Sequence, residues 1–220
     1  MDDPELDLAI SYAAPRVRSA IEALFALDSR LGAIVRATRE PMVGQLRLTW
    51  WHDALTKISQ SPVPKEPVLT ALAAHVVPAG VSGDALAVMV EGWEVLIDPG
   101  AHQSDAVDQH ADRRGATLFG LAAGLLDGDA DGQVLLAGQG WALADLARHA
   151  RDPAMAIAAR ASGRDRLDRA FARRWPRKLR PLGALAALAR YELRNDVSDV
   201  GRPGAPGRVS HMLWHRLSGR

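Results

Sequence analysis

The 220-residue chain contains no cysteine and carries almost no net charge. Without cysteine it can form no disulfide, no cysteine-ligated zinc site and no thiol nucleophile. Its 27 Lys and Arg nearly balance 26 Asp and Glu, which argues against a dedicated nucleic-acid-binding protein because that class needs clustered surplus cations. No uncharged apolar run approaches the roughly 20 residues of a transmembrane helix, and the acidic N-terminus does not resemble a signal peptide. We therefore expect a cytoplasmic protein that binds no nucleic acid and makes at most peripheral contact with a membrane.

Residues that favour β-strands are also scarce. The chain has six Ile, five Thr, two Tyr and three Phe, whereas Ala, Leu and Arg are abundant. Because the abundant residues lose little side-chain entropy in a helix, the composition predicts an all-α protein. We expect one helical domain that covers residues 1–220, since no shift in composition marks a domain boundary.

Proline, glycine and aspartate separate a series of amphipathic segments. An Arg-rich stretch at 151–180 and a Gly- and Pro-rich one at 196–207 predict a less tightly packed C-terminal third. The spacing of apolar residues predicts helices over residues 15–38, from 41 to before Pro62, and over 66–77, 82–97, 102–126, 131–150, 164–173, 179–194 and 205–218.

The most distinctive string is REPMVGQLRLTWWHDAL at 39–55. Trp50 and Trp51 point about 100° apart on a helix, and Arg47 lies four residues before Trp51, where its guanidinium can contact the indole. One of these tryptophans could therefore cover a pocket wall, or the two could form a packed aromatic hinge between two helices. Together with LFALDSRLGAIV, HADRRGATLFGLAAGLLDG and LAGQGWALADLARHARDP, this string resembles the squalene/phytoene synthase family over about residues 5–155.

This resemblance implies the isoprenoid-synthase fold and the joining of two prenyl diphosphates. In the family, acidic clusters on two facing helices bind the Mg²⁺ that neutralises the diphosphate leaving group. Aligned with this sequence, the first cluster falls on Gly32, Ala33 and Arg36, and only Asp28 lies nearby, one turn earlier. The first helix therefore lacks the family's metal ligands.

The second family motif, Asn-x-x-Arg-Asp-x-x-Glu-Asp, falls on residues 145–153. Arg148 is retained, whereas His149 and Asp152 stand where the family has Asp and Glu. Asp145, His149 and Asp152 would share one helix face and hold one metal weakly, or they would form an ion-pair network with neighbouring arginines. The loss of acids is similar to the aspartate-lacking branch of the family, which includes an assembly factor of mitochondrial respiratory complex I.

These substitutions predict a pseudoenzyme that binds a prenyl or other lipid-like ligand, or a protein partner. The alternatives are a divergent head-to-head prenyltransferase, which alone would require Mg²⁺, and a scaffold protein without a ligand. We assign no catalytic residue, metal site or cofactor. The expected vestigial pocket comprises Asp28, Gly32, Arg36, Arg47, Trp50, Trp51, Asp145, Arg148, His149 and Asp152.

Two C-terminal features have further interpretations. The basic stretch Arg160–Arg180, with Trp175, could contact an anionic membrane surface or an acidic partner, although a solvated helix pair is the simpler interpretation. His211 and His215 are spaced to bind a transition metal, but we expect them to lie on an exposed helix face.

Overall fold

The computed structural model describes residues 3–38, 40–60, 62–97, 103–195 and 202–220. All regular structure in these ranges is helical, so the predicted all-α class is confirmed. No helix within them is both long and apolar enough to cross a bilayer. The elements are α1 (Pro4–Ser11), α2 (Pro15–Ala37), α3 (Pro41–Thr56), α4 (Pro67–His75), α5 (Gly83–Glu94), α6 (Gln103–His110), a π-helical segment (Ala111–Ala116), α7 (Thr117–Leu125), α8 (Gly132–His149), α9 (Pro153–Ala170), α10 (Arg180–Arg194) and α12 (Pro206–Ser218), with short 3₁₀ turns at Val77–Ala79 and Arg177–Leu179.

Local sequence explains where several helices begin. Proline, whose missing N–H costs nothing in a first turn, opens α2, α3, α4, α9 and α12. The Asp131 carboxylate accepts hydrogen bonds from two backbone N–H groups at the start of α8. Most predicted helices are therefore confirmed to within a few residues. His102, the predicted start of α6, lies outside the described residues.

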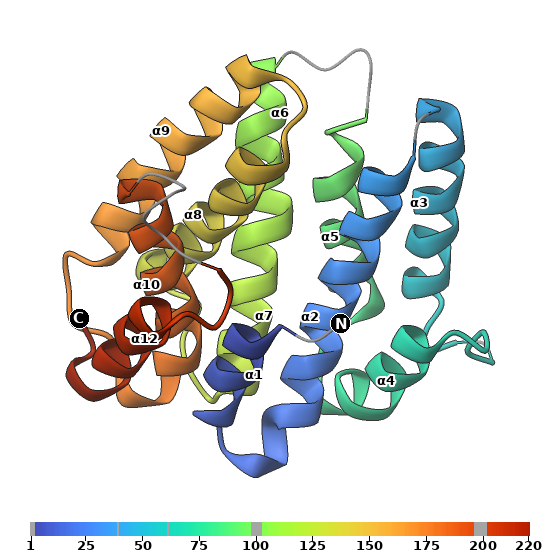
Figure 1. The fold of residues 1–220 in the computed structure, drawn as a ribbon. Helices are drawn as coiled ribbons and strands as arrows, with labels where there is room; N and C mark the ends of the chain where they lie inside the picture. The colour runs from blue at the N-terminus through green and yellow to red at the C-terminus, as the bar shows by residue number, and fades with distance from the viewer. Residues whose placement is uncertain (1–2, 39, 61, 98–102, 196–201) are drawn as a thin grey trace.

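The helices form a bundle in which α2, α7 and α8 contribute the central faces (Figure 1). α8 packs on α9 and on the π-helical segment, α3 covers α5, and α1 and α12 both pack against α10. Phe25, Phe119 and Trp141 meet in the interior, with ring centroids 5.7–6.5 Å apart. This continuous apolar core holds in place the helices that carry the charged groups described below.

The π-helical segment and α8 approach each other backbone to backbone. A Cβ added at Gly115 would lie 2.2 Å from the carbonyl oxygen of Gly138, and one added at Gly138 would lie 2.1 Å from that of Gly115. Only glycine permits this crossing. It brings the neighbouring residue, Arg114, into the space between α2 and α8.

Two helix predictions were wrong. α1 was not predicted, and α9 begins at Pro153 rather than at residue 164. α9 buries mainly small residues, Ala159, Gly163 and Ala170, with Leu167 as its one large apolar side chain. Because large apolar residues do not recur along its inner face, spacing alone did not reveal its first three turns.

The prediction of a loose C-terminal third was also wrong. Trp175, Leu182, Met212 and His215 are all almost completely buried. The expected exposed face is therefore wrong for His215, whereas His211 is exposed and packs against Tyr191 at a ring-centroid distance of 4.2 Å.

Candidate functional site

A buried arginine joins the two helices in which the family motifs fall. Arg114, only 3% exposed, donates from Nε and Nη2 to the two oxygens of Asp28 on α2, at 2.8 and 2.9 Å. Its Nη1 donates to Asp145 Oδ2 on α8 at 2.7 Å. The guanidinium carbon also lies 4.0 and 4.9 Å from the ring centroids of Trp93 and Trp141. Arg114 is thus paired with two carboxylates and enclosed by two indoles.

The local backbone explains this position. Arg114 belongs to the π-helical segment, whose wider turn re-aims side chains relative to a regular α-helix. A Cβ at Gly92 on α5 would lie 2.5 Å from the backbone nitrogen of Arg114, so glycine is needed for this approach. Trp93, the next residue, donates from its indole nitrogen to Asp28 Oδ1 at 3.1 Å. α5 and the π-helical segment therefore meet directly beside Asp28.

The His110 ring contacts the guanidinium of Arg114. Its Nδ1 lies 2.6 Å from the Gly92 carbonyl oxygen and its Nε2 lies 3.2 Å from Arg114 Nη1. A neutral ring with the proton on Nδ1 satisfies both contacts, because Nε2 can then accept from Arg114. Burial, and then the charge of Arg114, lower the pKa of His110 to about 3. The ring is therefore neutral at physiological pH.

Several cationic side chains surround the carboxylate of Asp145. Its Oδ1 lies 2.9 Å from His149 Nδ1, and Arg36 and Arg148 approach its carboxylate at 3.8 Å. Burial alone would raise the pKa of Asp145, but the charges and hydrogen bonds of Arg114 and His149 outweigh it and hold that pKa well below its usual range. The same hydrogen bond raises the pKa of His149, against the effect of burial. Asp145 is therefore a fixed negative charge.

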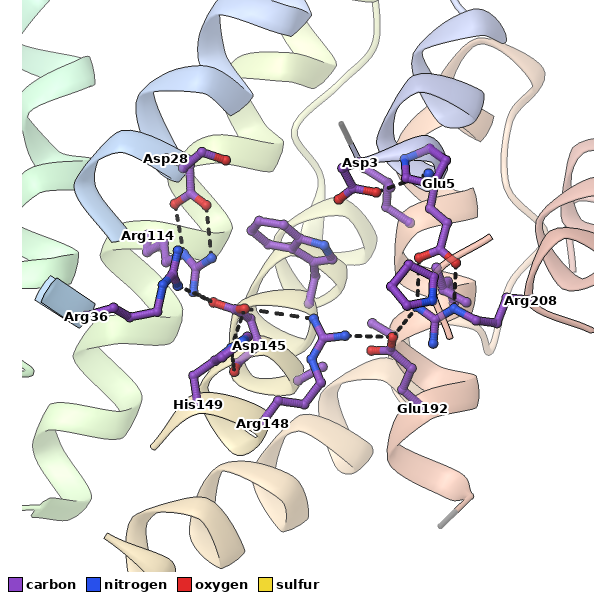
Figure 2. A pocket seen from close by; sticks show the side chains of 18 residues that line it. Asp3, Glu5, Asp28, Arg36, Arg114, Asp145, Arg148, His149, Glu192 and Arg208 are labelled. Carbon is purple, nitrogen blue, oxygen red and sulfur yellow. Dashed lines mark hydrogen bonds and ion pairs between the residues drawn. The ribbon is translucent and has the colours of Figure 1, made fainter. Parts of the chain in front are cut away.

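The ion pairs continue across the bundle to both ends of the chain (Figure 2). Arg148 donates to Glu192 on α10 at 2.8 Å, and Glu192 accepts from Arg208 on α12. Arg208 Nη2 donates to Glu5 on α1 at 2.7 Å. Burial raises the pKa of Glu5, but hydrogen bonds from Arg208 and from the Gly204 backbone, together with the charge of Arg208, give a net lowering. Carboxylates and guanidiniums thus alternate from α2 to α1; we call this series, Asp28–Arg114–Asp145–Arg148–Glu192–Arg208–Glu5, the charge chain.

The charge chain lines a cavity of about 460 Å³, the central cavity. A second hollow of about 370 Å³, the apolar branch, shares Arg36, Arg114, Asp145 and His149 with it. The other side chains that line the apolar branch are mostly apolar and include Val35, Trp93, Leu96, Ile97, Leu146 and Met155. One continuous site therefore has a charged part and an apolar part.

The structure brings together half of the predicted pocket residues. Asp28, Arg36, Asp145, Arg148 and His149 all line the central cavity. Gly32 is buried beside it, where a Cβ would lie 2.8 Å from Trp93, so the indole occupies the space that an aspartate side chain would need.

The other four predicted residues lie elsewhere. Arg47, Trp50 and Trp51 line a separate hollow of about 410 Å³ between α2 and α3. Arg47 makes no cation–π contact with Trp51 in the described part of the chain; instead the rings of Trp50 and Trp51 meet edge to face at 5.4 Å. Asp152 reaches the edge of the apolar branch but accepts a hydrogen bond from the Ala154 N–H and caps α9. Because α8 ends at His149, Asp152 does not continue its helix face.

Sequence reasoning missed Arg114, His110, Glu5, Glu192 and Arg208 as site residues. Arg114 and His110 lie within the HADRRG string, four residues apart, but the π-helical turn that aims Arg114 inward leaves no sign in the apolar spacing. Glu192 and Arg208 come from helices beyond the region of family resemblance. Arg114 stands in the polar run DQHADRR, so its sequence context did not distinguish it from an arginine on an exposed surface.

The arrangement does not fit a magnesium diphosphate site. Magnesium needs oxygen ligands free to complete a near-octahedral shell. The carboxylates that α2 and α8 direct toward each other already bond to Arg114, and a metal ion between them would meet a fixed positive charge. Arg36, at a position where the family has an acid, adds a second cation beside Asp145.

Taken together, the structure is an all-α bundle of the isoprenoid-synthase type with a charged cavity between α2 and α8. The profile of squalene/phytoene synthase matches residues 2–160, and the chain belongs to that family. Comparisons with curated proteins and with solved structures gave no match.

We expect Arg114→Met to lower the free energy of unfolding by about 3–5 kcal/mol, because it leaves Asp28 and Asp145 without their shared cation. The matched control is Arg113→Met, which removes an ion pair with Glu91 whose side chains are about two-fifths exposed; it should cost at most about 1 kcal/mol. Urea unfolding at neutral pH measures both. Adding Asp28→Asn and Asp145→Asn to Arg114→Met should recover part of the loss. Equal effects of the two single variants would contradict this role for Arg114.

Proposed function

We propose that this protein is a non-catalytic member of the squalene/phytoene synthase family, close to its aspartate-lacking branch, that binds an anionic, lipid-like ligand. The observation that carries the proposal is Arg114, which bridges Asp28 and Asp145 where a synthase would need metal ligands.

Prenyl transfer by the family chemistry depends on stabilising the diphosphate as it leaves. Removing one well-placed electrostatic stabiliser typically costs ~10²–10³-fold in rate. Here Gly32, Ala33 and Arg36 replace acids on α2, and the two carboxylates that face each other from α2 and α8, Asp28 and Asp145, are neutralised by a guanidinium held within the protein. These losses act at the same leaving group, so we expect no useful turnover.

The shape and charge of the site favour an amphipathic anion as ligand. The apolar branch, at about 370 Å³, falls within the ~300–1,000 Å³ range of small-molecule pockets. At its junction with the central cavity lie the half-exposed Arg36 and His149, whose raised pKa favours the charged form, while Arg148 lines the central cavity. An apolar tail in the branch would place a phosphate near these groups.

The test of lost catalysis is an assay with farnesyl or geranylgeranyl diphosphate and Mg²⁺. We expect neither coupled hydrocarbon product nor diphosphate release above the rate without protein, because Arg114 already occupies the carboxylates of Asp28 and Asp145. A family synthase with intact acidic clusters, assayed in parallel, is the positive control. Formation of squalene or phytoene would overturn the proposal and support the divergent prenyltransferase, particularly if Asp152→Ala abolished it.

Ligand binding can be tested with a substitution that fills the apolar branch. Met155→Trp should weaken binding of geranylgeranyl diphosphate, measured calorimetrically with a chelator present, by about tenfold or more, because the indole takes the space of the tail. Ile157→Trp is the matched control, since Ile157 is 70% exposed on the same helix and should leave affinity unchanged. Inorganic diphosphate should bind both variants alike. Equal affinity of both variants for the prenyl compound would refute a tail in this branch.

The second candidate function is that of a scaffold for another protein. It is favoured by α3, where Met42, Leu46 and Trp50, four residues apart, are 72%, 67% and 46% exposed. Native mass spectrometry on protein purified without detergent separates the two functions. A retained lipid supports the first candidate, whereas a protein that binds neither cellular lipid nor added prenyl diphosphate favours the second.

A further inference from the structure

The outer face of α12 is apolar although it faces away from the bundle. α12 directs Arg208, Met212 and His215 inward, where all three are buried. On the opposite side Leu213, Trp214 and Leu217 are 42%, 64% and 74% exposed. At 100° per residue these three side chains fall within one 100° arc of the helix. We call them the α12 apolar face; α12 lies at the edge of the bundle (Figure 1).

The α12 apolar face is bordered by arginines. Arg180 donates to the carbonyl oxygens of Arg216 and Leu217, and Arg174 donates to that of Ser218. Burial lowers the pKa of Arg180, and the nearby charges of Arg174 and Arg177 lower that pKa further. The segment after α9 thus places several guanidiniums around the C-terminal end of α12.

These cations have no acidic counterpart nearby in sequence. The chain contains no Asp or Glu at residues 169–191 or 202–220, although its overall charge is close to neutral. Within the described ranges, neither Arg174, Arg177 nor Arg216 forms an ion pair with a carboxylate. Positive charge is therefore concentrated beside the α12 apolar face.

We propose that this face docks on a membrane surface that contains anionic phospholipids. Trp and Leu side chains would enter the interface while arginines contact phosphates, which is the usual division of an interfacial amphipathic helix. A second copy of the chain is a poorer occupant, because a symmetric contact would bring the same unpaired arginines together. This placement revises the expectation from sequence, since Trp175 of the basic stretch is buried and Trp214 is the exposed aromatic residue.

The proposal does not depend on which ligand the central cavity binds, but it would place that cavity close to the membrane. The inward side of α12 carries Arg208, which lines the central cavity and bonds Glu5 and Glu192. A membrane bound on the outer side of this helix would lie one helix diameter, about 10 Å, from that cavity.

The experiment is flotation of the full chain with phosphatidylcholine vesicles, with and without phosphatidylglycerol, at low and high salt. We expect binding only to the anionic vesicles, and weaker binding at high salt. Trp214→Ser and Leu217→Ser should each reduce the partition coefficient on the order of tenfold. Arg177→Ser should reduce it about fivefold.

The matched controls are Trp50→Ser and Leu46→Ser, which remove exposed apolar side chains of the same types from α3. They should leave vesicle binding unchanged. The proposal is overturned if the wild type does not bind anionic vesicles, or if the α3 and α12 variants lose binding equally. A wild-type protein that does not bind vesicles but forms a dimer, which Trp214→Ser converts to a monomer, would also overturn the proposal. That result would assign the α12 apolar face to contact with a second copy of the chain.

Discussion

The architecture of this site depends on a single buried cation. Taking a guanidinium out of water costs several kcal/mol, and it is tolerated only where carboxylates and further hydrogen bonds compensate. Arg114 obtains that compensation from Asp28 and Asp145 on facing helices, and two indoles enclose it. The pairing holds α2, the π-helical segment and α8 together by charge. It also determines what the site can bind, because the carboxylates of Asp28 and Asp145 are already engaged by cations of the protein itself.

The same alternation of charge joins the two ends of the chain. Arg148, Glu192 and Arg208 carry it from α8 through α10 to α12, and Glu5 completes it on α1. Each carboxylate in this series meets at least one guanidinium, so the central cavity is strongly polar yet close to neutral. At its half-exposed edge, next to the apolar branch, Arg36 and His149 share Asp145 with Arg114. This is why an amphipathic anion is the ligand class that we propose.

Much of the fold could be predicted from sequence, because prolines at first helical positions and recurring apolar residues mark most helices. α9 was misjudged because the inner face of its first three turns carries small residues, such as Ala159 and Gly163, where a recurring series of large apolar residues would have marked a helix. The site was predicted only in part. Family spacing identified Asp28, Arg36, Asp145, Arg148 and His149, but placed Trp50 and Trp51 in the same pocket, whereas α3 directs them to another hollow. Arg114 could not be found in this way, because its direction depends on a π-helical turn and on glycines that allow backbones to touch.

Whether Arg114 keeps metal ions out of the space between α2 and α8 can be seen in a crystal structure of the protein grown with Mn²⁺ and inorganic diphosphate, with data collected for anomalous scattering from manganese. We expect no anomalous peak between α2 and α8, and an Arg114 guanidinium that is bonded to both Asp28 and Asp145. A manganese ion held by those two carboxylates, with Arg114 displaced from between them, would contradict that expectation.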